Sequence, residues 1–269
     1  MQIVDFTGVD RIAREGHTSK GDQPKWKHAD SWYKADHMGY EALSEIIVSR
    51  LLSWANADNF VIYHPVRIRY NGKEAPGCVS RNFMRKGEML IPFERLHRAY
   101  EGQGLAQALA SFDEVSDRIV YTVDFVERIT NLTGVGAYLT AILELDCLTL
   151  NEDRHTNNLA VLRNEETKEF RLCPIFDNGL SLLSDLNDYP LDDDLHACIE
   201  RVKAKPFDQD HTEQVMSAEQ LYGKQFTFCM AHEELRTELE QLSDLYSPQI
   251  LQRVERVLLE QKRKRSWLF

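Results

Sequence analysis

The decapeptide "LNEDRHTNNL", residues 150–159, forms a polar stretch between two apolar regions in the middle of the chain. A long segment with helical spacing precedes it, and two short β-prone runs follow it as a predicted hairpin. Asn158 comes five positions after Asp153, and Asp177 lies 19 residues beyond Asn158, where the hairpin ends. Each of these residues alone is typical of turns and helix ends. Their joint spacing is the feature that predicts the fold.

These three polar residues supply the groups that phosphoryl transfer needs. The reaction requires one carboxylate that orients the attacking hydroxyl, and oxygen ligands that hold Mg²⁺ on the phosphates of a nucleotide. We therefore predict Asp153 as the catalytic base, and Asn158 and Asp177 as metal ligands that also contact the nucleotide. ATP and Mg²⁺ are the cofactors that this set implies.

Such a site also needs a lysine that reaches the phosphates and an acid that holds the lysine. Lys34 ends an aromatic, β-prone run, and the helical pattern that follows carries Glu41 and Glu45 on one face. We expect Lys34 to act in catalysis and to contact the phosphates. Glu41 is the preferred partner of Lys34, and Glu45 is the alternative.

The chain divides into two regions of different pattern. Residues 1–85 are rich in β-prone runs and contain one helix, so they predict a small mixed N-terminal lobe that binds the nucleotide. From about Gly87 helical patterns dominate, apart from the hairpin after residue 159, so residues 86–269 predict a larger, mostly helical C-terminal lobe. The fold class is α+β, with a short connection between the lobes near residues 81–88.

Composition excludes several classes of protein. The 269 residues include 43% hydrophobic side chains and no apolar segment long enough to cross a bilayer, so we expect a cytoplasmic globular protein without a membrane partner. Five scattered cysteines without a CxxC pair argue against a disulfide framework or a zinc cluster, and we expect buried thiols. With 32 basic and 43 acidic residues, the net charge of −11 argues against a nucleic-acid partner.

The segments "NEDRHTNN", "PIFDNG" and "WYKAD" with "GYEALSE" together resemble the HipA-like serine/threonine kinases. The resemblance covers most of the chain and extends weakly into residues 203–215. It implies a bilobal protein-kinase-like fold. It also implies an ATP- and magnesium-dependent kinase that transfers the γ-phosphate to a hydroxyl of a protein substrate or to a hydroxyl of the kinase itself.

Carried over by position, the resemblance implies Asp153 as catalytic base, Asn158 and Asp177 as magnesium ligands, and Lys34 as the lysine at the phosphates. His155 occupies the position of the family's loop histidine in the catalytic set, and we expect it to brace the loop by hydrogen bonds. "FDNG" replaces the "DFG" of ordinary protein kinases, so a switch based on a flipping phenylalanine does not carry over.

Two departures from the family pattern limit this transfer. Full-length HipA toxins have an additional N-terminal subdomain, and we expect this chain to be a short form without it, so a repressor partnership is not carried over. The family's phosphate loop corresponds to residues 14–28, which lack a GxGxxG pattern. There we expect Ser19 and Gly21 to contact phosphate, and Ser19 is the candidate for autophosphorylation.

Other interpretations stay open at this stage. The chain fits a nucleotide-binding pseudokinase that acts as an interaction module, or a small-molecule or lipid kinase of the same fold. A metal hydrolase would use His155 with the two aspartates. The acidic stretch 184–194 either attracts a basic substrate or is a solvated loop, and in one interpretation Lys203 and Lys205 face the phosphates.

Overall fold

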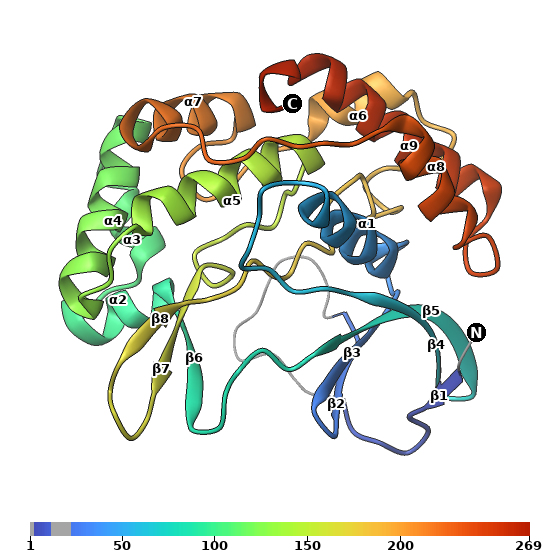
Figure 1. The fold of residues 1–269 in the computed structure, drawn as a ribbon, viewed down its shortest axis with the longest axis horizontal. Coiled ribbons are helices and arrows are strands. Elements are labelled where there is room, and N and C mark those ends of the chain that lie inside the picture. Colours follow the sequence, from blue (N-terminus) through green and yellow to red (C-terminus); the bar gives the residue numbers. More distant parts are fainter. Residues whose placement is uncertain (1–2, 12–22) are drawn as a thin grey trace.

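The structure of the protein is a computed structural model, and it describes residues 3–11 and 23–269. Within these ranges a mixed sheet and helix α1 lie beside a second, smaller sheet and a helical region (Figure 1). The first sheet has the order β1-β4-β5-β3-β2, with β1 parallel to β4 and the other pairs antiparallel. Its strands are β1 (Ile3–Asp5), β2 (Lys25–His28), β3 (Ser31–Ala35), β4 (His64–Tyr70) and β5 (Lys73–Arg81).

Two tight hairpins set the register of this sheet. The β4–β5 turn consists of Asn71 and Gly72, whose φ angles of 50° and 72° belong to the two-residue turns that join twisted strands. In the β2–β3 hairpin Lys25 pairs directly with Lys34, so both lysine side chains leave the same face of the sheet. The expectation that residues 14–28 form one phosphate loop is wrong for Lys25–His28, because these residues pair with β3.

Helix α1 (Glu41–Ser53) forms where the sequence predicts it and is buried around almost its whole circumference. Its apolar residues, such as Leu43 and Ile47, belong to the same core cluster as the helices of the C-terminal region. The sheet has a small core of its own around Phe6 and Trp26, whose rings stack at 4.9 Å. Helix α1 therefore connects the sheet to the helical region.

The second sheet includes a strand that the sequence pattern did not predict. Residues after Gly87 were expected to be helical, but β6 (Glu88–Pro92) pairs with β7 (Ala160–Asn164), which pairs in turn with β8 (Phe170–Leu172). The correction has a simple cause. A five-residue strand whose partner lies about 70 residues later carries no local signal of its pairing.

In the view of Figure 1 most of the remaining helices lie above the two sheets, and α2 lies to the left of the second sheet. Within the described ranges every helix is too short or too polar to span a lipid bilayer.

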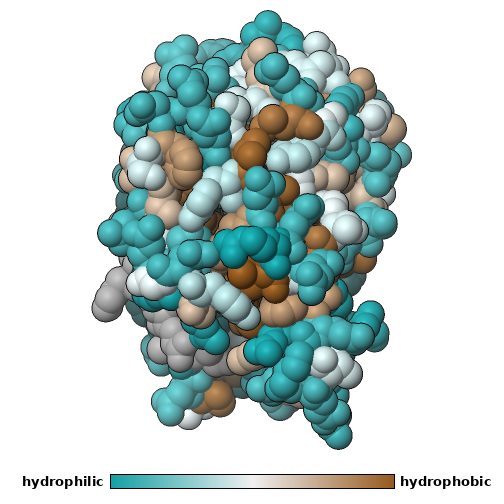
Figure 2. Space-filling view, turned by 90° about the vertical axis from the view of Figure 1, so that its left-hand side faces the viewer, coloured by the Kyte–Doolittle hydropathy of each residue, from teal (hydrophilic) through white to brown (hydrophobic). Residues whose placement is uncertain are grey.

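Figure 2 shows that the face over α2, α3 and the second sheet is mainly hydrophilic, with hydrophobic residues in a narrow central strip. Of the cysteines expected to be buried, Cys229 is exposed. The helices are α2 (Phe93–Glu101), α3 (Leu105–Leu109), α4 (Val115–Thr130), α5 (Val135–Thr149), α6 (Leu195–Arg201), α7 (His211–Tyr222), α8 (His232–Glu240), α9 (Pro248–Lys264) and the 3₁₀ turn η1 (Ser266–Leu268).

Candidate functional site

Lys34 on β3 lies at the centre of a buried group of charges. Its Nζ atom forms an ion pair with Glu45 of α1 and lies 2.8 Å from Oδ1 of Asp177. The Tyr63 ring lies below, with its centroid 5.3 Å from the same nitrogen. Burial alone would lower the pKa of Lys34, but the carboxylates of Asp177 and Glu45 outweigh burial and raise this pKa well above its ordinary value. The ammonium group is therefore fixed in its charged form.

The preference for Glu41 as partner of Lys34 is wrong, because Glu41 has another task. Its carboxylate accepts hydrogen bonds from the backbone N–H groups of residues 37–39, at 3.2, 2.8 and 3.1 Å. Glu41 therefore fixes the loop before α1, whereas an amide of the first helical turn, that of Ala42, donates to Asp36 at 2.6 Å. Glu45 lies one turn later on the same face, and it is the glutamate that reaches Lys34.

Asp177 lies in the "FDNG" turn after β8 and has a φ of 60°, which is uncommon for a residue with a side chain. Its Oδ1 atom contacts Lys34 and also lies 3.4 Å from Nζ of Lys25. The next backbone amide, that of Asn178, donates to Oε2 of Glu45 at 2.9 Å. Glu45 therefore connects the lysine to the turn that carries Asp177, so the three elements β3, α1 and the turn hold one another in place.

Lys25 is a member of this group that sequence reasoning missed. The missing information was the register of the β2–β3 hairpin, in which Lys25 lies opposite Lys34. A tight turn at residues 29–30 would have predicted this pairing, because antiparallel neighbours directly opposite each other share a face. The ammonium groups of Lys25 and Lys34 thus both approach the carboxylate of Asp177.

The loop after α5 places Asp153 at the edge of the site. Asn158 donates from Nδ2 to the backbone oxygen of Asp153 at 2.8 Å, and the amide of His155 donates to the same oxygen at 2.8 Å. Nδ1 of His155 accepts from the amide of Asn157 at 3.2 Å, and its Nε2 lies 3.7 Å from Oδ2 of Asp153. These contacts brace the loop as expected of His155, while its part in catalysis stays a prediction.

Arg154 is the second residue that sequence reasoning missed. Its guanidinium group is buried and makes a fork to Asp146 of α5, with distances of 2.9 and 3.0 Å. It also donates to the backbone oxygen of Phe176 at 2.8 Å and to Oδ1 of Asn178 at 2.6 Å. This bidentate arrangement fixes the loop of Asp153 to the turn of Asp177. The available signal was an aspartate inside the apolar run "LELDCLTL".

Lys205 adds a positive charge next to Asp153. It lies in the segment between α6 and α7, and its Nζ atom is 3.6 Å from Oδ1 of Asp153. The structure thus brings together Lys34, Glu45 and Asp177 at one end of the site, and Asp153 with Asn158 and Lys205 at the other. Ser19 and Gly21, expected to contact phosphate, lie outside the described residues.

A five-stranded sheet with helix α1, a buried lysine–glutamate pair, a braced polar loop and an aspartate after a hairpin are features of a kinase-like fold. The same fold is found in the crystal structure of the Helicobacter pylori proinflammatory kinase CtkA, with a TM-score of 0.63 and 15% identity, over 97% of this chain and 94% of that chain. It is also found in HipA of a Shewanella oneidensis MR-1 toxin–antitoxin system, solved with HipB and operator DNA. There the TM-score is 0.50 and the identity 12%, over 95% of this chain and 66% of that chain.

No family model and no curated protein matches the sequence. The HipA-like kinase fold that the motifs predicted is confirmed by these structures, and so is the α+β fold class.

Proposed function

We propose that the protein is an ATP- and magnesium-dependent phosphotransferase, a HipA-like serine/threonine kinase that transfers the γ-phosphate to a protein hydroxyl, its own included. The observation that carries this proposal is the chain of contacts Lys34–Glu45–Asn178 beside Asp177. It ties a lysine on a strand, an acid on a helix and the aspartate after the hairpin into one unit, which is the arrangement that nucleotide phosphates require in kinases.

The nucleotide would lie between the proposed lobes, residues 1–85 and 86–269, with its adenine near the connection at residues 81–88. The charged ammonium of Lys34 would contact the phosphates, and Glu45 would hold the ammonium in place. Lys25 would contribute a second positive charge at the same position. Because phosphoryl transfer depends mainly on positioning and on neutralisation of charge, two fixed cations suit this chemistry.

Asn158 and Asp177 would hold Mg²⁺ on the phosphates. Asp177 fits this role because its carboxylate lies beside the two lysines that would contact the phosphates, at 2.8 and 3.4 Å. Asn158 fits because its Nδ2 is used in the contact with Asp153, so Oδ1 would be the ligand atom. Two protein oxygens are a usual contribution to a magnesium ion that phosphates and water also ligate. When bound, the ion neutralises charge on the phosphates.

Asp153 would accept the proton of the attacking hydroxyl and orient the hydroxyl oxygen toward the γ-phosphate. Its backbone oxygen is held by Asn158 and by the amide of His155, so its side chain is carried on a braced loop. Lys205 would stabilise the negative charge that gathers between the acceptor and the phosphate.

The test is transfer of labelled γ-phosphate from ATP and magnesium to the protein itself and to proteins of a cell lysate. We expect transfer by the unaltered protein and none by the Asp153→Ala variant. Magnesium-dependent binding of ATP without transfer to any acceptor would support a pseudokinase, and transfer by Asp153→Ala would contradict the role of Asp153.

A further inference from the structure

A cleft of about 470 Å³ lies directly beside the catalytic loop. Its lining includes two neighbours of Asp153. Lys205 contacts Oδ1 of Asp153 at 3.6 Å, and Glu152 precedes Asp153 in the chain. The cleft therefore adjoins Asp153 through Glu152 and Lys205. The lining consists of Glu152, Asp188, Tyr189, Arg201, Lys203 and Lys205.

The charge of this lining is opposite to that of the chain as a whole. Three of the six residues are cationic and two are anionic, whereas the chain carries a net charge of −11. Oε2 of Glu152 accepts a hydrogen bond from the hydroxyl of Tyr189 at 2.7 Å, and Arg201 pairs with Asp193 at 2.8 Å, so one anion and one cation of the lining are engaged within the protein. Lys203 is exposed, and the side chain of Lys205 is 39% exposed. The ammonium group of Lys203 can therefore meet an incoming anion, whereas that of Lys205 already lies 3.6 Å from Oδ1 of Asp153.

The acidic stretch 184–194 is largely used for internal contacts. Asp193 pairs with Arg201 at 2.8 Å, and the side chain of Asp194 accepts from the amide of Ala197 and begins helix α6. Arg253 of α9 donates to the backbone oxygens of residues 189 and 190, at 2.7 and 3.0 Å. These contacts anchor the stretch to α6 and α9.

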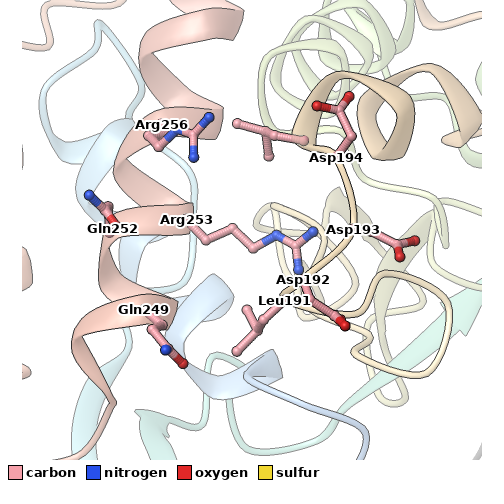
Figure 3. Close-up of a pocket in the computed structure, with 9 residues that line it drawn as sticks. Leu191, Asp192, Asp193, Asp194, Gln249, Gln252, Arg253 and Arg256 are labelled. Atoms are coloured by element: carbon pink, nitrogen blue, oxygen red, sulfur yellow. The ribbon is translucent and has the colours of Figure 1, made fainter.

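The aspartates at 192–194 line a different pocket. Figure 3 shows this pocket, with the loop of Asp192, Asp193 and Asp194 on one side and Arg253 and Arg256 of α9 on the other. The acidic stretch contributes Asp188 and Tyr189 to the cleft, but the contact with Asp153 comes from the cationic residue Lys205.

We propose that this cleft binds an acidic protein segment, in which aspartate or glutamate residues flank the acceptor serine or threonine. The inference rests on the proposed function and names its substrate class. Lys203 is the specificity-determining residue, because its exposed ammonium group pairs with a carboxylate beside the acceptor hydroxyl. Lys205 lies closer to Asp153 and aligns the acceptor together with it.

The surroundings of the cleft favour an extended segment over a membrane surface. Asp188 is an exposed member of the lining, and the aspartates at 192–194 belong to the adjoining loop. A broad anionic surface would be repelled by these carboxylates, whereas one extended chain can place a single carboxylate against Lys203. The acceptor class is therefore a peptide and not a lipid headgroup.

Two measurements on the full chain test the proposal. The first is binding of fluorescent peptides without ATP, in which a central serine is flanked by aspartate, alanine or lysine. The second is phosphotransfer to the same peptides with ATP and magnesium. We expect the aspartate-flanked peptide to bind about two- to fivefold more tightly than the alanine-flanked one, since one partly exposed charge pair with Lys203 contributes a factor of this size. Raising the salt concentration should reduce this difference.

The Lys203→Glu variant should remove the preference for aspartate and favour the lysine-flanked peptide, through KM and not through kcat. Lys73→Glu is the matched control, because it changes the net charge equally at the exposed first residue of β5 and should keep the preference.

The outcomes separate this proposal from the function on which it rests. Transfer without preference for acidic peptides, or an unchanged preference in Lys203→Glu, would overturn the acidic substrate class and leave the kinase activity standing. In a third arm, vesicles that contain phosphatidylinositol replace the peptides, and transfer to these vesicles with none to any peptide would overturn it as well. Lys203-dependent binding of acidic peptides without transfer to any acceptor would support the cleft and contradict the proposed kinase activity.

Discussion

Replacement of Glu45 by Gln removes the negative charge that Lys34 contacts and keeps the size of the side chain. The Glu45 side chain is fully buried, and its carboxylate accepts from Lys34 and from the amide of Asn178. Removing one partner of a buried ion pair typically costs about 3–5 kcal/mol. Because Lys34 keeps Asp177 at 2.8 Å and the glutamine oxygen remains an acceptor, we expect a loss of about 2–3 kcal/mol in the free energy of unfolding.

If the Lys34–Glu45 pair positions Lys34 at the phosphates, Glu45→Gln should also lose about 2–3 kcal/mol of transition-state stabilisation. A loss of about 2–3 kcal/mol of transition-state stabilisation lowers kcat/KM by about 30- to 150-fold. Urea unfolding followed by circular dichroism measures the first quantity, and phosphotransfer from labelled ATP measures the second.

Glu41→Gln is the matched control, because Glu41 and Glu45 lie on the same helix face and are both buried. Glutamine keeps an acceptor for the backbone amides of residues 37–39, so we expect a loss of about 1 kcal/mol in stability and less than about threefold in activity. Equal loss of activity in the two variants, or unchanged activity in Glu45→Gln, would refute the assignment of Glu45.

Three further predictions concern stability. Burial lowers the pKa of His211 from 6.5 to about 4, so the stability that neutral His211 gives, about 3 kcal/mol in the free energy of unfolding, is complete above pH 6.5 and is lost as the pH falls toward 4. Urea unfolding of His211→Gln should therefore depend less on pH between 6.5 and 4. The same pH dependence as in the unaltered protein would contradict a buried, neutral His211. Arg154→Lys loses the fork to Asp146 and should unfold about 3 kcal/mol more easily, whereas a thermal midpoint equal to that of the unaltered protein would argue against the brace. In Gly39→Ala the new Cβ would lie 2.0 Å from the backbone oxygen of Ser184, so we expect a loss of about 1–3 kcal/mol in urea unfolding, and full stability would show that this contact relaxes freely.

The parts of the fold that were predictable from sequence are those with a strong local pattern. Helix α1 and helices α4 and α5 have apolar residues at helical spacing, and β7 and β8 flank a polar turn. The short connection at residues 82–87, between β5 and β6, falls where the patterns change. Strand β6 was not predictable, because it is defined by a partner far along the chain.

The site shows the same division between local and distant information. The spacing of Asp153, Asn158 and Asp177 is a property of one continuous segment, so the sequence predicts them together. The choice between Glu41 and Glu45 depends on where the start of α1 lies relative to β3, which no local pattern records. Lys25 likewise depends on a hairpin register.

Phosphotransfer by the Asp153→Asn variant tests the central claim most directly, provided that its binding of ATP and magnesium is first shown to be within about twofold of that of the unaltered protein. Asparagine keeps the shape of the side chain and cannot accept the proton of the acceptor hydroxyl, and general-base catalysis contributes about 10²–10⁴-fold. The account predicts a loss of transfer of at least about 100-fold with nucleotide binding intact. Transfer at the rate of the unaltered protein would contradict it.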